Sequence, residues 1–161
     1  QNCYLSSNIN CGLVTGENFK GTMWINSPDC RGNNLYGMAF NVNHNKIQIN
    51  SPHIADNGSA QPSVSAGIQV LDGANDISIM GGYIGGNVFG QHVNSGNQQI
   101  GIRFVGDNHQ RININGVDVN NNGQGGSGGI DWNNTSGNNV NSGTNFIQNC
   151  PGYSTGQTSF P

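Results

Sequence analysis

Apolar residues recur at every second position in short segments that glycine and asparagine separate. Segments of the form Gly-Φ-x-Φ, where Φ is apolar, begin at Gly37, Gly67, Gly101 and Gly129, with Gly12-Leu13 as a partial first member. A period of two is typical of a β-strand with one buried face, and no stretch sustains the 3.6-residue period of an amphipathic helix. The pattern predicts an all-β protein.

A second apolar segment follows each of these glycines after ten or eleven residues, and its copies share a longer template. Residues Met23–Asn33 align without a gap with Ile47–Asn57, and the two share Ile-Asn-Ser-Pro. Ile77–Asn87 and Ile112–Asn122 follow the same template, Φ-x-Φ-x4-Φ-x2-Asn, and Val140–Cys150 is a weaker copy. Each unit therefore contains three short strands, and the unit is repeated in the same order.

Units that repeat in one direction predict stacking rather than hairpins. If each unit is one coil of a solenoid, equivalent strands pair in parallel about 4.8 Å apart, and their apolar residues form an axial core. We therefore predict a parallel β-helix of about five coils over residues 12–150, in which Ile49, Ile79 and Ile114 lie over one another. Residues 1–11 are expected to form an N-terminal cap or linker, and residues 151–161 a short irregular C-terminal tail.

Composition agrees with a thin core and many corners. The chain of 161 residues has 29 Asn and 26 Gly, and only 33% of its residues are hydrophobic. Asn and Gly tolerate the left-handed backbone region that sharp corners need. Asn33, Asn57, Asn87 and Asn122 fall at one corner of successive coils, so we expect their amides to form a hydrogen-bonded ladder.

Charge and motif content exclude several classes of function. Five Lys and Arg stand against eight Asp and Glu, a net charge of −3, which lacks the basic surface that nucleic acids or anionic membranes require. No apolar run is long enough to span a bilayer. The four cysteines lack the close spacing of a zinc site and the four histidines are dispersed, so no metal or cofactor is expected. Cys30 takes an apolar position and is expected to be buried. Because the chain begins with Gln1 rather than Met, we expect a processed product or a fragment.

The coil spacing, the Asn corner and the Gly-Asn-rich composition resemble right-handed parallel β-helix proteins of the pectate-lyase-like superfamily, in particular bacteriophage tailspikes and appendages. The resemblance covers about Gly12 to Cys150, and the Cys-Pro-Gly-Tyr tail that begins at Cys150 is similar to the endings of some such proteins. It implies a right-handed helix and a homotrimeric, extracellular virion protein directed at the surface polysaccharide of a host. The catalytic strings of the polygalacturonase branch are not present: Gly90-Gln91-His92-Val93, for example, is not a Gly-His-Gly.

Coil length varies after the Asn corner, which predicts that insertions leave the solenoid on one side. In repeat proteins that side is often the binding face. The longest excursion contains Phe89, Gln91 and His92, an aromatic ring and polar groups suited to a sugar ring and its hydroxyls. Contact with a neighbouring subunit is an equally good interpretation of these loops.

Two outward columns follow from the repeat. The position before the third apolar segment holds Asp29, His53, Tyr83 and Asp118, a ladder that could grip an extended glycan, although exposed polar residues are ordinary on a solenoid face. Trp24 also points outward and is a candidate glycan or interface residue. A second column holds the charged residues Lys46, Asp76 and Arg111, which we interpret as cross-strand charge pairs, and we expect a similar pair between Arg103 and Asp131.

A catalytic alternative rests on two carboxylates at one corner. Asp72 and Asp107 follow their glycines by five and six residues, with His109 close by, and adjacent coils can supply the carboxylate spacing of a glycoside hydrolase. The competing interpretation is a turn, since Asp72-Gly73 is itself a turn signal.

Three functional hypotheses follow. The first is a phage spike or appendage module that binds host surface polysaccharide. The second is a polysaccharide depolymerase, a glycoside hydrolase or lyase of the tailspike type, although the sequence contains no complete catalytic motif. The third is a purely structural virion component whose loops contact other virion proteins.

Overall fold

A computed structural model describes residues 4–17, 19–60, 65–85, 98–106, 109–120, 122, 129–133 and 146–151. These residues form strands, turns and bends, and no helix occurs among them. The all-β prediction is confirmed.

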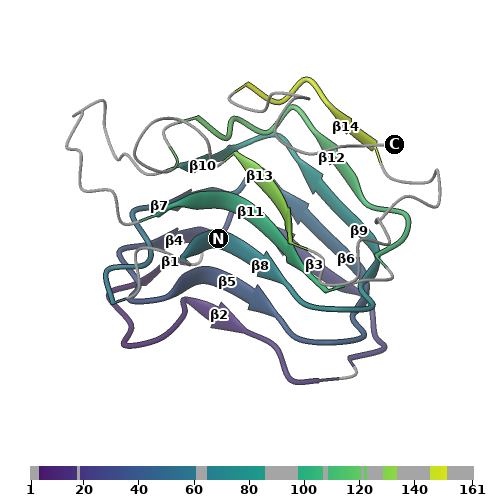
Figure 1. The fold of residues 1–161 in the computed structure, drawn as a ribbon, viewed down its shortest axis with the longest axis horizontal. Coiled ribbons are helices and arrows are strands. Elements are labelled where there is room, and N and C mark those ends of the chain that lie inside the picture. The colour runs from purple at the N-terminus through teal and green to yellow at the C-terminus, as the bar shows by residue number, and fades with distance from the viewer. Residues whose placement is uncertain are drawn as a thin grey trace.

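The strands form three parallel sheets, which we name A, B and C (Figure 1). Sheet A contains β1 (Tyr4–Ser6), β4 (Asp29–Arg31), β7 (His53–Ala55) and β10 (Tyr83–Gly85). Sheet B contains β2 (Leu13–Val14), β5 (Tyr36–Phe40), β8 (Ala66–Val70), β11 (Ile100–Val105) and β13 (Ile130–Asn133). Sheet C contains β3 (Met23–Asn26), β6 (Asn45–Asn50), β9 (Asn75–Met80), β12 (Asn113–Asn115) and β14 (Phe146–Gln148).

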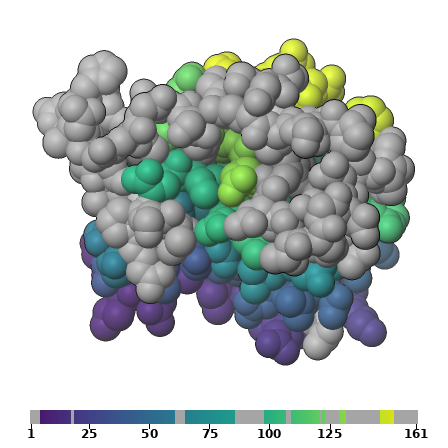
Figure 2. Space-filling model, viewed as in Figure 1, coloured from purple at the N-terminus to yellow at the C-terminus, as the bar shows by residue number. Residues whose placement is uncertain are grey.

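The chain passes through the sheets in a fixed order, B then C then A, from β2 to β10. After β12 an isolated parallel bridge between Tyr83 and Asp118 stands where a further sheet A strand would lie. Strand β1 lies within residues 1–11, the segment expected to be a cap or linker, and it pairs with β4 in sheet A. In the space-filling view the colours change in bands from purple to green, as expected of windings that lie on one another (Figure 2). This arrangement is consistent with a parallel β-solenoid.

The core consists of apolar columns that run across the sheets. In sheet C, Ile49 pairs with Ile79, and Ile79 with Ile114, and all three side chains are fully buried. In sheet A, Cys30 pairs with Ile54 and both are fully buried, as expected for Cys30. The predicted stack is therefore confirmed, and these columns fill the interior.

A ladder of buried amides closes the corner between sheets A and B. Asn33 Nδ2 donates to Asn57 Oδ1 at 2.8 Å, Asn57 Nδ2 to Gln98 Oε1 at 3.0 Å, and Gln98 Nε2 to Asn122 Oδ1 at 2.9 Å. The predicted ladder is correct for Asn33, Asn57 and Asn122, but Gln98 forms the step between the last two. Asn87 lies outside the described residues.

Close packing at this corner explains the glycines that open the segments at Gly37 and Gly67, where an isoleucine of sheet A, a backbone carbonyl and a ladder amide all approach the glycine. A Cβ on Gly37 would lie 2.7 Å from the carbonyl oxygen of Gly67 and 3.0 Å from Asn57 Nδ2. A Cβ on Gly67 would lie 2.8 Å from the carbonyl oxygen of Gly101 and 2.9 Å from Gln98 Nε2. These positions require glycine because the backbone and the ladder amides approach them too closely for any side chain.

The connections between sheets differ in length at one corner and not at another. The turn from sheet C to sheet A occupies residues 27–28, 51–52 and 81–82 in successive windings. Its first residue takes positive φ each time, 46° at Ser27, 47° at Ser51 and 61° at Gly81. The connection from sheet A to sheet B instead occupies 32–35, 56–65 and 86–99. The connection from sheet B to sheet C occupies 15–22, 41–44, 71–74 and 106–112, so it varies as well, but over a smaller range. The largest variation in length therefore lies between sheets A and B, where the sequence predicted it.

Candidate functional site

The outward face of sheet C carries one continuous row of side chains. Strand register pairs Trp24 with Gln48, Gln48 with Ser78, Ser78 with Asn113 and Asn113 with Phe146. The two aromatic residues at the ends are exposed, Trp24 at 73% and Phe146 at 62%, and so is Gln48 between them. Their alternation with the buried core residues places every member of this row, which we call the Trp24 row, on one surface. Neighbouring members lie about 4.8 Å apart, so the row spans roughly 19 Å.

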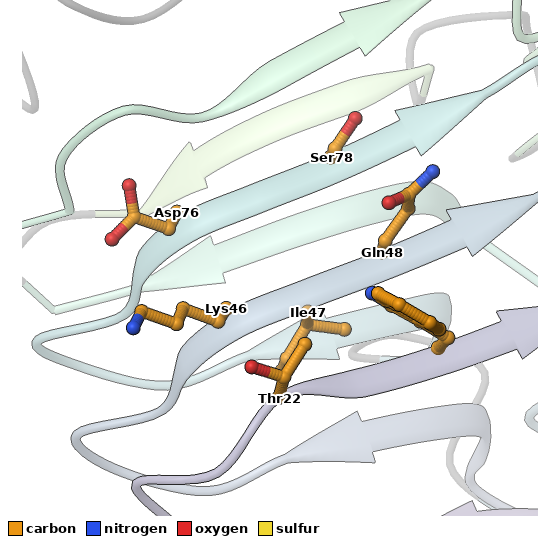
Figure 3. A pocket seen from close by; sticks show the side chains of 7 residues that line it. Thr22, Lys46, Ile47, Gln48, Asp76 and Ser78 are labelled. Atoms are coloured by element: carbon orange, nitrogen blue, oxygen red, sulfur yellow. The ribbon is translucent and has the colours of Figure 1, made fainter.

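A shallow groove of about 370 Å³ lies at the Trp24 end of the row. Its lining comes from strands β3, β6 and β9 and from the residue before β3: Thr22, Trp24, Lys46, Ile47, Gln48, Asp76 and Ser78 (Figure 3). Figure 3 shows Lys46 and Gln48 on either side of Ile47, with Asp76 and Ser78 on the next strand. The groove therefore combines an aromatic ring, hydroxyl and amide groups, and charge.

The charges in the groove are unequally satisfied. Arg111 donates to Asp76 through Nε at 2.6 Å and through Nη2 at 2.9 Å, which confirms that part of the predicted charge column. These hydrogen bonds hold the pKa of Asp76 below its usual range and raise that of Arg111, with the charges adding to the effect. Lys46, the residue before Ile47, belongs to the same charge column as Asp76 and is exposed. Asp76 thus enters the groove with its charge already compensated.

The predicted column on sheet A is brought together in register, and both of its aspartates accept hydrogen bonds from nearby residues. Asp29 pairs in register with His53, His53 with Tyr83, and Tyr83 with Asp118. Asp29 accepts two hydrogen bonds from Arg31, at 2.6 and 2.7 Å, and lies 3.6 Å from His53 Nδ1. Asp118 Oδ1 accepts from the backbone N–H and the Nδ2 of Asn120.

A third Arg–Asp pair, one that the sequence predicted, lies on sheet B. Arg103 Nε lies 3.6 Å from Asp131 Oδ2, and the two residues pair in register on β11 and β13. Burial raises the pKa of Asp131, and the charge of Arg103 opposes that rise. Burial therefore exceeds the pairing here, the reverse of the balance at Asp76.

The proposed catalytic residues occupy different environments where they are described. Asp72 is exposed. His109 is 1% exposed, and its ring meets Phe104 edge-on with centroids 5.3 Å apart. Asp107 lies outside the described residues, so the carboxylate separation that the hypothesis needs stays a prediction. The loop candidates Phe89, Gln91 and His92 also lie outside the described residues and remain predictions.

A buried histidine was not singled out from the sequence. His44 is fully buried, its Nε2 lies 2.8 Å from both Thr15 Oγ1 and the carbonyl oxygen of Gly16, and Phe19 stacks on its ring. It precedes β6 as His109 precedes the equivalent bridge residue Gln110. This recurrence of histidine at one corner was the available signal, and it indicates a structural role.

The described ranges contain three cysteines. Cys11, Cys30 and Cys150 carry free thiols, and burial raises the pKa of Cys11 and of Cys150, which disfavours the reactive thiolate. Across the same ranges, His, Cys, Asp and Glu nowhere gather in threes as a metal ion would need. Nor do these ranges contain a helix long and apolar enough to cross a membrane.

Comparisons of the chain with protein-family models, with curated proteins and with solved structures found no match.

Proposed function

We propose that the chain is a right-handed parallel β-helix of about five coils that binds polysaccharide of a host cell surface, as a module of a phage spike or appendage. The observation that carries this proposal is the Trp24 row, with an exposed ring at each end and amide and hydroxyl groups between. The apolar face of a sugar ring stacks on an aromatic ring, while its hydroxyls exchange hydrogen bonds with amides. A flat row of repeated polar groups suits an extended polymer better than a compact ligand.

The amides beside the row support this use. Asn50 Nδ2 donates to Asn26 Oδ1 at 2.7 Å, and Gln48 Nε2 donates to Asn50 Oδ1 at 3.2 Å, all on the outer face of sheet C. Bonds between neighbouring amides fix the side chains in place and leave each with further donor or acceptor capacity. A polymer that binds there meets groups that are already ordered, which lowers the entropic cost of binding.

The test is an array of bacterial and plant polysaccharides, probed with the full chain and with two variants. Trp24→Ala removes the exposed ring of sheet C, and the matched variant His53→Ala removes a ring from the sheet A column. We expect wild type and His53→Ala to retain the same polysaccharides and Trp24→Ala to lose them, with all three proteins unfolding at similar temperatures. Retention by Trp24→Ala, or binding to no polysaccharide, would refute the proposal.

The proposed module is homotrimeric and extracellular, as part of the virion. Light scattering on the purified chain tests the first point, with a mass of three chains expected and a single-chain mass contradicting it. Antibody labelling of intact particles tests the second, and labelling only after disruption would contradict it.

A further inference from the structure

We propose that the groove at Trp24 binds an anionic sugar unit, one that carries a single carboxylate, and that Lys46 is the counter-ion of that carboxylate. This inference rests on the proposed function, since it assumes that the outer face of sheet C binds glycans. It adds the chemical class of the ligand.

The distribution of cations over the molecule singles out Lys46. The chain has five Lys and Arg in all. Arg31 pairs with Asp29, Arg103 with Asp131 and Arg111 with Asp76. The two lysines remain, and Lys46 is the one that lines the groove. No salt bridge joins Lys46 to any of the residues that the structure describes.

Asp76 does not use up the charge of Lys46. Both of its carboxylate oxygens already accept hydrogen bonds from Arg111. The attraction between Lys46 and Asp76 acts at a distance and ranks below the contribution of Arg111. A carboxylate that enters the groove therefore meets an ammonium group still able to donate hydrogen bonds, and a charge-assisted bond of this kind is about twice as strong as a neutral one.

The spacing fits one sugar ring. Lys46 and Gln48 are two residues apart on β6, and Gln48 pairs with Trp24 on β3. In a regular strand two residues span roughly 6.6 Å, and the φ of 58° at Lys46 shortens that rise, so Lys46 and Trp24 are separated by at most roughly 6.6 Å along the strand and about 4.8 Å across it. A pyranose stacked on Trp24 directs a ring substituent towards Lys46, and its hydroxyls lie over Gln48 and Ser78. The stacked face and the carboxylate then belong to the same sugar ring. The groove therefore selects a uronate-type unit rather than a neutral sugar next to a separate anion.

The net charge limits how anionic the polymer can be. At −3 the chain repels a densely charged polymer, and one lysine cannot offset many sulfates or phosphates. A polysaccharide with a carboxylate on some of its units satisfies both constraints, because each groove then meets one charge.

The experiment compares acidic polysaccharides with their own neutral forms. Hyaluronate, which carries a carboxylate on alternate units, and partially reduced polygalacturonate and alginate, which carry one on some of their units, are each immobilised beside the same polymer after complete reduction of its carboxyl groups, with dextran and galactan as neutral references. Binding of the full chain is measured at low and at high salt, together with Lys46→Gln, Lys46→Arg and the charge-matched control Lys20→Gln. Lys20 is exposed and does not line the groove.

We expect at least one acidic polymer to bind, and its reduced form to bind about tenfold more weakly. Lys46→Gln should weaken binding of the acidic form by a similar factor and leave that of the reduced form unchanged. Lys46→Arg should retain most of the binding, Lys20→Gln all of it, and high salt should shrink the difference.

Two results would overturn the inference and are distinguishable. If acidic and reduced forms bind equally, or if Lys46→Gln and wild type bind alike, the anionic class is wrong while glycan binding stands. If no polymer binds, acidic or neutral, the proposed function fails and this inference fails with it.

Discussion

The outer faces of sheets A and C are built from the same winding, yet they differ in what their polar groups contact. On sheet A, Asp29 is held by Arg31 and lies beside His53, so its hydrogen-bonding capacity is largely taken up within the protein. On sheet C, the Trp24 row is flanked by amides and ends in two exposed rings. A face whose groups satisfy one another stabilises a fold, whereas a face with ordered but unsaturated groups can bind a ligand. The sequence predicts that both faces are exposed, and this does not distinguish them. The hydrogen-bond partners of each side chain in the structure do distinguish them.

The largest expected effect on stability comes from comparing an inward-facing residue of β6 with an outward-facing one. Ile49→Ala empties a fully buried position on β6 between Ile25 and Ile79, and should lower the free energy of unfolding by about 2–5 kcal/mol. Gln48→Ala, the next residue on the same strand, faces outward and should change stability by no more than about 0.5 kcal/mol. Urea unfolding measures both, and equal losses would contradict the assignment of inner and outer faces.

A smaller effect compares two amide pairs. Asn57 is fully buried after sheet A, where it donates to Cys30 and Gln98 and accepts from Asn33. Asn57→Ala leaves buried groups without partners and should cost about 1–3 kcal/mol. Asn50→Ala removes the exposed pair on sheet C, where water replaces the lost bond, so its cost should be several times lower. Thermal unfolding of the two variants measures both costs. If Asn50→Ala lowers stability as much as Asn57→Ala, burial is not the reason that the Asn57 amide stabilises the fold.

Binding variants sharpen the comparison of the faces. Phe146→Ala shortens the Trp24 row at its far end and should weaken polysaccharide binding by roughly fivefold to tenfold. Tyr83→Ala removes a half-buried ring of the sheet A column and should leave binding unchanged. Titration of a polysaccharide that wild type retains gives both affinities. A larger loss for Tyr83→Ala would move the ligand to sheet A and revive the column predicted from the sequence.

The smallest effect concerns two carboxyl groups of opposite behaviour. The pKa of Asp76 is lowered in the folded state by Arg111, so its contribution to stability is present above the ordinary range of Asp and is lost as pH falls through the lowered value. The pKa of Asp131 is raised by burial, so its contribution is present at low pH and is lost as pH rises through the raised value. Unfolding temperatures of Asp76→Asn and Asp131→Asn against wild type from pH 2 to 7 should therefore diverge in opposite directions. Added salt should reduce the Asp76 effect, because that side chain is 37% exposed.

Much of the architecture was readable from the sequence because the repeat carries it. The order of apolar residues predicted parallel strands and the stack of Ile49, Ile79 and Ile114, since every winding places the same residue type at the same position. The glycine spacing was equally informative. Its cause, the close approach of a sheet A isoleucine, a backbone carbonyl and a ladder amide, became evident only in three dimensions.

The site was less predictable because it depends on which side chains satisfy one another. Trp24 was identified as outward-facing, but Phe146 was not, since its unit is the most divergent copy. In the sequence Lys46 is an ordinary member of a charge column. The structure distinguishes it, because Arg111 and Asp76 bond to each other and Lys46 takes no part in that pair. Gln98 forms the step between Asn57 and Asn122, and a template of fixed spacing could not predict a glutamine that comes so far after the third segment.

Gln98 shows how such a chain could accept foreign segments. Its side chain is one methylene longer than asparagine, and it reaches the same step of the ladder after twelve residues that follow the end of β10, whereas Asn33 and Asn57 follow their sheet A strands after a single residue. This corner needs only one amide in the right place, and the backbone can reach that place by connections of different length. A change in the length of the connection therefore does not shift the strands that follow. Evolution, or an engineer, could exchange the material before that amide and keep every later winding in register.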